Sequence, residues 1–373
     1  MEKEIVPIND LASQHRILLP QIISAIEEVI TSGRYVLGKN VEKLEKEIAA
    51  LCAVRYGVGV NSGTDALTLS LHALNIGRGD EVITSPFSFV ASAESIIIVG
   101  ARPIFADIDP LTFNISPKEI EKKLGKRTTA IMPVHLFGQA CDMTRIMEIA
   151  RRNSLLVIED SAQAIGAYHR GKPVCSFGDV GCLSFYPTKN LGAVGDGGMV
   201  LTSDEQLYEK LKLLRCHGGR DYTFDFLGTN SRLDELQAAV LLVKLKYLNE
   251  WTEKRRANAK LYKELLKDVE EVTLPLESEE NFHTYHQFTI RARNRDELRK
   301  YLWEEGIQTM VYYPVPLHLQ PAFSHLGYKE GDFPEAEKAA KEVISLPIHA
   351  QLKEEQVIRI ANAIRKFYKR REV

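Results

Sequence analysis

Cysteine is scarce in this chain of 373 residues, and its spacing excludes the sites that cysteines usually build. No two of the five cysteines form a Cys-x-x-Cys pair; they are Cys52, Cys141, Cys175, Cys182 and Cys216. An odd count without paired spacing argues against a disulfide framework and against a zinc site. We therefore expect reduced thiols, no bound metal and a cytoplasmic protein.

The chain also lacks an excess of charge of one sign and any long apolar run. Its net charge is -2, from 48 Lys+Arg and 50 Asp+Glu, so neither a nucleic-acid surface nor a basic membrane-binding face is expected. No apolar run approaches the roughly 18 residues that span a bilayer. The first residues show no basic-then-apolar signal pattern. With 45% hydrophobic residues, the composition is that of a globular protein with a large core.

Short apolar runs alternate with helical stretches over the first two-thirds of the chain. The runs that predict strands are 56–60, 81–85, 103–106, 130–134, 155–159, 181–185 and 199–202. Several are apolar throughout, as a sheet buried on both faces requires. Because helical stretches such as 64–74 and 143–153 lie between them, the pattern predicts an α/β fold with a mostly parallel seven-stranded sheet between helices.

From about Leu233 the pattern becomes helical. Residues 236–266 predict either one long helix or a broken pair. A strand, a helix and a terminal helix are predicted after them, at 286–291, 296–304 and 354–368. We therefore expect a smaller α+β domain at 249–373. The larger domain would be 1–248, and its N-terminal helix (about 18–32) can pack on either domain.

Lys189 and Asp160 are the most informative residues, and each follows an apolar strand candidate. Pyridoxal phosphate (PLP) enzymes need a lysine amine for a Schiff base and a carboxylate that keeps the ring nitrogen protonated. The alternatives are a solvated loop lysine and an aspartate that caps the next turn. A glycine-rich stretch at 192–198 follows the lysine and indicates tight backbone geometry near a site.

Other polar and aromatic residues follow strand ends at the same predicted edge. At the start of a helix, Gly63 allows close backbone approach and Thr64 offers a hydroxyl to an anion, although Ser62 or Thr64 can also be a plain helix cap. Phe89 can stack on a planar cofactor or pack in the core. Ligands of doubly wound sheets bind beyond the carboxyl ends of the strands.

Two residues complete this predicted edge. Gln163 can reach the phenolic oxygen of the cofactor, and Ser184 can donate to its phosphate. Taken together, the residues predict a site for PLP or for another phosphorylated ligand.

At these residues the chain resembles the DegT/StrS-type sugar aminotransferases, which are fold-type I PLP enzymes. The matching motifs occur in order along nearly the whole chain: 62–67, 79–83, 100–103, 134–138, 159–163, 184–190, 195–198, 217–218, 230–234, 237–239 and 313–318.

The resemblance implies that Lys189 carries the cofactor and moves protons, while Asp160 pairs with the ring nitrogen. The other implied cofactor contacts are Gln163 at the phenolic oxygen, Phe89 on the ring, and Gly63, Thr64 and Ser184 at the phosphate. Asn230 would reach the phosphate from the partner subunit, so the active unit would be a homodimer with shared sites. The implied sugar-side residues are Arg232, Tyr312 and Tyr313, and His318 is added because it lies near them in sequence.

The resemblance further implies transfer of an amino group from L-glutamate to C3 of a nucleotide-linked keto sugar. The chain looks most like enzymes acting on UDP-2-acetamido-3-keto-glucuronate, although some of those carry His where this chain has Tyr312. A 4-keto-sugar or cyclitol (inosose) aminotransferase is an alternative within the family. A sugar dehydratase would replace Lys189 by histidine. A non-catalytic PLP-binding regulator is the alternative from another class.

Overall fold

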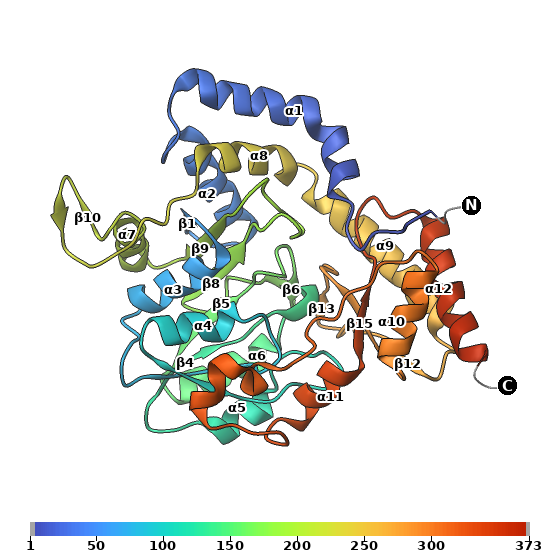
Figure 1. Cartoon of the computed structure of the whole chain (residues 1–373). Coiled ribbons are helices and arrows are strands. Elements are labelled where there is room, and N and C mark those ends of the chain that lie inside the picture. The colour runs from blue at the N-terminus through green and yellow to red at the C-terminus, as the bar shows by residue number, and fades with distance from the viewer. Residues whose placement is uncertain (1–3, 371–373) are drawn as a thin grey trace.

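A seven-stranded sheet forms the centre of the protein in a computed structural model that describes residues 4–370 (Figure 1). The strands are ordered β1-β9-β8-β5-β4-β2-β3. Their bounds are β1 (Tyr56–Val60), β2 (Glu81–Thr84), β3 (Arg102–Phe105), β4 (Thr128–Met132), β5 (Leu156–Asp160), β8 (Val180–Ser184) and β9 (Gly198–Thr202). Only β9 runs antiparallel to its neighbours, β1 and β8. The predicted mostly parallel seven-stranded sheet is therefore confirmed.

Helices cover both faces of this sheet because successive strand residues point to opposite sides. In β5, Val157 packs in the core cluster of Ile146 from α6, whereas Ile158 packs in that of Leu67 from α3. The helices of this part are α1 (Leu11–Ser32), α2 (Lys39–Leu51), α3 (Gly63–Ala73), α4 (Ala91–Ile98), α5 (Pro117–Lys123), α6 (Met143–Arg152), α7 (Glu205–Leu214) and α8 (Glu235–Leu245). The first of them, α1, lies along α8 (Figure 1).

A second hydrophobic core lies in the C-terminal part, where helices pack on a three-stranded antiparallel sheet ordered β12-β14-β15. Its elements are α9 (Leu248–Leu266), β12 (Val272–Thr273), β14 (Phe288–Ala292), α10 (Arg295–Glu304), α11 (Pro334–Glu342), β15 (Val343–Leu346) and α12 (Glu354–Lys369). Of the two alternatives for 236–266, the broken pair α8 and α9 is the observed one. The division at residue 248 falls at this break and remains our proposal.

The N-terminal segment departs from that division. Val6 is fully buried in the C-terminal core, and its amide donates to the carbonyl of Gly306 at 2.8 Å. Gln308 donates back to the carbonyl of Val6 at 3.0 Å. Val6 therefore packs in the C-terminal core, and α1 then crosses to α8.

Several short elements lie outside these two sheets. They are β6 (Tyr168–His169), β7 (Lys172–Pro173), β10 (Gly219–Arg220), β11 (Thr223–Phe224), β13 (Asn281–Phe282), η1 (Leu136–Gly138), η2 (Leu317–Leu319) and η3 (Pro321–Leu326). The β13-β6-β7 sheet joins a strand of the C-terminal half to a hairpin of the first half. Within residues 4–370, no helix is both long and apolar enough to cross a membrane.

Candidate active site

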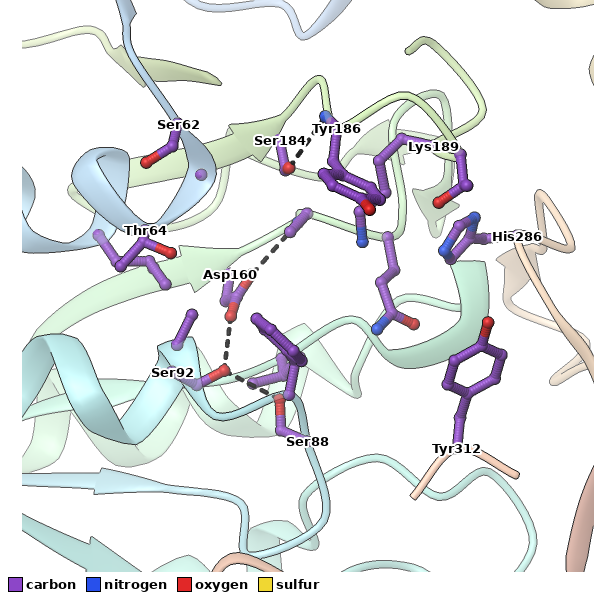
Figure 2. A pocket seen from close by; sticks show the side chains of 18 of the residues that line it. Ser62, Thr64, Ser88, Ser92, Asp160, Ser184, Tyr186, Lys189, His286 and Tyr312 are labelled. Atoms are coloured by element: carbon purple, nitrogen blue, oxygen red, sulfur yellow. Dashed lines mark hydrogen bonds between the residues drawn. The ribbon is translucent and has the colours of Figure 1, made fainter. Parts of the chain in front are cut away.

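A cavity of about 600 Å³ opens where β5 and β8 end and α3 begins (Figure 2). The predicted residues that line it are Gly63, Thr64, Phe89, Asp160, Gln163, Ser184, Lys189, Tyr312 and Tyr313. Parallel strands end at a common edge, which is why residues from distant parts of the sequence meet here.

Asp160 is the last residue of β5, and its carboxylate is buried at the wall of the cavity. Ser92 donates its hydroxyl proton to Oδ2 at 2.7 Å, and the backbone amide of Ala162 donates to Oδ1 at 3.2 Å. Burial raises the pKa of Asp160, and these two hydrogen bonds oppose that shift, as do the charges of Lys189 and His135. Asp160 does cap the following turn, but the hydrogen bond from Ala162 uses only its Oδ1.

Lys189 extends its amine into the same cavity from the loop after β8. Burial lowers the pKa of Lys189 to about 8, and the negative charge of Asp160 opposes the shift. Within residues 4–370, the amine makes no hydrogen bond to another group. A lysine that loses its proton near neutral pH is available as a nucleophile and as a base.

This lowered pKa predicts unusual reactivity of Lys189 in the apoprotein. Labelling by an amine-specific reagent such as trinitrobenzenesulfonate should have a pH midpoint near 8 at Lys189, against roughly 10.4 for an ordinary lysine. Peptide mass spectrometry of samples labelled across a pH series measures each lysine separately, so exposed lysines such as Lys122 provide the control. A midpoint at Lys189 equal to that of Lys122 would contradict the described environment.

The start of α3 forms one end of the cavity. Ser62 is the helix cap, because its hydroxyl accepts from the amide of Asp65 at 3.0 Å, which leaves Thr64 at the cavity wall (Figure 2). Gly63 faces Ser184 so closely that a Cβ atom would lie 2.6 Å from Ser184 Cβ. The free N–H groups of the helix N-terminus and two hydroxyls thus converge, as a phosphate site requires.

Substituting alanine at Gly63 should weaken cofactor binding. The added methyl group must displace Ser184, whose hydroxyl would lie 3.1 Å from it. Loss of one hydrogen bond to a charged group corresponds to about 10- to 100-fold weaker binding. Titration of the apoprotein with PLP measures this, with Gly125→Ala as the control, since a Cβ there meets its nearest atom only at 3.6 Å. Equal affinities in the two variants would remove Gly63 from the phosphate site.

The amide of Gln163 has a defined orientation. Its Oε1 accepts from the backbone amide of Phe137 at 2.8 Å, so the other end of the amide is the donor. That Nε2 donates to the hydroxyl of Tyr313 at 3.0 Å. The second N–H of this Nε2 is left for a ligand in the cavity, as contact with a phenolic oxygen requires.

Two neighbouring aromatic residues differ in burial. Phe87 is 1% exposed and packs in a core of aromatic rings, whereas Phe89 is 56% exposed and lines the cavity. Core packing therefore accounts for Phe87 and not for Phe89, whose ring is free to contact a planar ligand.

Three predicted residues lie outside the cavity of this single chain. Asn230 is exposed, in an isolated β-bridge with Cys216, and Arg232 is half-buried beside it. Their predicted role from a partner subunit remains a prediction. His318 is buried, and its Nε2 lies 3.0 Å from Oε1 of Glu337, while its predicted contact with the substrate remains a prediction.

Several residues that line the cavity were not predicted from the sequence, among them Tyr186, His286 and Gln287. His286 lies beside Lys189, and its Nδ1 is 3.3 Å from Oδ1 of Asn190. Burial lowers the pKa of His286 well below its usual range, with the charge of Lys189 as a further cause. No motif marked it, because it precedes a strand of the other domain.

The cavity suits PLP by its chemistry: an amine without a hydrogen-bond partner among residues 4–370, a buried carboxylate held by donors, and an anion site at a helix N-terminus. Residues 4–370 contain no cluster of three or more His, Cys, Asp or Glu that could hold a metal ion. Fold and cavity together define a PLP-dependent enzyme of the aminotransferase kind.

Comparison with known proteins supports this enzyme class. The DegT/DnrJ/EryC1/StrS aminotransferase family matches residues 18–365. A "Pleiotropic regulatory protein" of Geobacillus stearothermophilus is 52% identical over 98% of this chain and 99% of its own. A UDP-N-acetyl-3-dehydro-alpha-D-glucosamine 3-aminotransferase of Acidithiobacillus ferrooxidans is 45% identical over 97% of each chain. The crystal structure of DesV from S. venezuelae has a TM-score of 0.96, with 42% identity and 98% of each chain covered.

The chain therefore belongs to the DegT/DnrJ/EryC1/StrS aminotransferase family. Aminotransferases of this family use PLP, so the predicted family, enzyme class and cofactor are confirmed.

Proposed function

We propose that this enzyme transfers the amino group of L-glutamate to the C3 keto group of a nucleotide-linked sugar. The observation that carries the proposal is one cavity that holds both the Lys189 amine and the buried Asp160 carboxylate. The 3-aminotransferase activity in the name of the Acidithiobacillus relative supports C3 over C4 or a cyclitol.

The geometry of the site supports the proposed cofactor contacts. Gly63, Thr64 and Ser184 would hold the phosphate, and Gln163 would donate to the phenolic oxygen. Phe89 would cover the ring. When bound, PLP supplies a protonated ring that stabilises negative charge at the substrate carbon.

Lys189 would move the proton. Because its pKa is about 8, a large fraction of the amine is neutral in mildly alkaline solution. The amine can take a proton from the α-carbon of glutamate in the first half-reaction and return one to the sugar carbon in the second. Phe89 and Tyr313, whose ring centroids are 6.4 Å apart, would limit water at the reacting atoms.

UDP-2-acetamido-3-keto-glucuronate is one candidate substrate, and its carboxylate requires a cation. Among the residues that line the cavity, Lys189 is the only lysine or arginine, and the chemistry needs its amine. Arg232 of a second copy is the proposed partner for that carboxylate, while Tyr312 offers only a hydroxyl. Without Arg232, the uncharged glucosamine counterpart would be the better substrate.

We propose a homodimer in which each active site includes residues of both subunits. Exposed apolar side chains support an interface: Tyr222 and Leu227, near the β10–β11 hairpin, are 97% and 96% exposed, and Ile17 of α1 is 71% exposed. All five cysteines are unpaired, which suits the reducing cytoplasm that we propose as the compartment.

The first test is spectroscopic. The purified protein with PLP should be yellow and should bleach when L-glutamate is added, with release of 2-oxoglutarate. The 3-keto sugar should then restore the colour, and a 4-keto sugar and an inosose serve as comparisons. A colour that glutamate leaves unchanged would contradict glutamate as donor, and binding without any turnover would favour a regulator.

The shared site has its own test. Lys189→Ala and Asn230→Ala variants are each expected to be impaired alone. A mixture that exchanges subunits should regain activity, because one site of the heterodimer then holds both intact residues. No recovery after demonstrated exchange would place Asn230 outside the partner's site.

A further inference from the structure

Two serine hydroxyls form a chain that ends on the catalytic carboxylate (Figure 2). Ser92 lies in the first turn of α4 and donates to Asp160 Oδ2 at 2.7 Å. Ser88 Oγ lies 2.9 Å from Ser92 Oγ. Both serines line the cavity wall but are buried, at 3% and 1% exposure for Ser88 and Ser92.

The direction of this chain follows from the number of protons. An ionised carboxylate only accepts, so Ser92 must donate to it. A hydroxyl has a single proton, so Ser92 can only accept from Ser88. Hydrogen bonds arranged head to tail polarise one another, and a charged acceptor strengthens the last of them.

We propose that Ser92, supported by Ser88, is a positioning residue that keeps Asp160 ionised while the carboxylate holds a proton on the cofactor ring. This role rests on the proposed function and extends it to a residue outside the direct cofactor contacts. A proton shared between a carboxylate and a ring nitrogen lies on the group with the higher proton affinity. A donor to the carboxylate lowers its proton affinity, so the proton stays on the nitrogen.

Other groups near Asp160 divide into two kinds. Lys189 and His135 favour its ionised form. The groups whose charged forms would disfavour it are Cys141, Cys182 and Tyr313, and burial raises the pKa of each of these. These three groups therefore stay neutral. Among the hydrogen-bond donors to Asp160, Ser92 does most to lower the pKa that burial raises.

The test compares Ser92→Ala, Ser92→Thr and Ser88→Ala in the enzyme loaded with ¹⁵N-labelled PLP. In Ser92→Ala, the ring-nitrogen signal should move toward the unprotonated form at neutral pH. The equilibrium between the two proton positions should change by about 10- to 100-fold, as loss of a hydrogen bond to a charged group predicts. Ser92→Thr should restore the wild-type signal, and Ser88→Ala should give a smaller change in the same direction.

A second measurement needs no cofactor. In the ¹³C-labelled apoprotein, the titration midpoint of the Asp160 carboxyl should rise in Ser92→Ala and stay at the wild-type value in Ser92→Thr. Unchanged signals in both Ser92→Ala and Ser88→Ala would overturn the proposal. If wild type fails to bind PLP, the proposed function fails, whereas the apoprotein titration still decides whether Ser92 controls the charge of Asp160.

Discussion

Replacing Lys189 by alanine is expected to abolish turnover. General acid–base catalysis alone contributes about 10²- to 10⁴-fold, and covalent attachment of the cofactor is lost as well. We therefore expect a loss of at least about 10³-fold in the rate of 2-oxoglutarate formation from L-glutamate and a 3-keto nucleotide sugar. Among residues 4–370 of this chain, no second lysine lines the cavity that could take over from Lys189.

The variant should remain folded, which makes the result interpretable. The amine of Lys189 forms no hydrogen bond within residues 4–370, and burying it lowers its pKa, so its removal breaks no stabilising contact. Lys122→Ala is the matched control, because Lys122 is an exposed residue of α5 that pairs with Glu119 at 2.6 Å. Turnover near the wild-type rate in Lys189→Ala would remove this residue from the mechanism.

Much of the fold was predictable because buried strands carry a strong signal. Residues 155–158, which include Val157 and Ile158, are all apolar, and the two faces of this strand do pack on different helices. The end of each apolar run also marks the end of a strand. Asp160 and Ser184 could therefore be assigned to the sheet edge where ligands bind. The break between α8 and α9 left two alternatives, since no glycine or proline marks residues 246–247.

The rest of the site depends on contacts that local patterns do not record. Asn190 and His286 are 96 residues apart, yet they meet because the C-terminal half packs beside the sheet edge. In the sequence, nothing distinguishes Ser92 from other helical serines. In the fold, α4 places its hydroxyl 2.7 Å from Oδ2 of Asp160. Likewise, only the hydrogen bond from the amide of Asp65 identifies Ser62 as the helix cap. Thr64 is then not needed as the cap.

Replacing Asp160 by asparagine should separate activity from stability. Removing one member of a buried charge pair costs about 3–5 kcal/mol, which corresponds to roughly 10²- to 10⁴-fold in rate if the protonated ring loses its partner. The measurement is the rate of 2-oxoglutarate formation, with PLP at a concentration that saturates the variant. A wild-type rate would contradict the proposed pairing of Asp160 with the ring nitrogen.

The same substitution should leave the apoprotein at least as stable at neutral pH. Burial raises the pKa of Asp160 in the folded state above its ordinary value of 3.8. At pH values between the ordinary and the raised pKa, the folded state therefore binds more protons than the unfolded state. Stability therefore falls as pH rises through that window, and ionised Asp160 costs stability above it. Asparagine removes this cost. Thermal unfolding of the two apoproteins should show that the stability of the variant relative to wild type is greater at pH 7 than near pH 4. A variant that loses stability there would mean that Asp160 supports the fold, and its lower rate would then say little about catalysis.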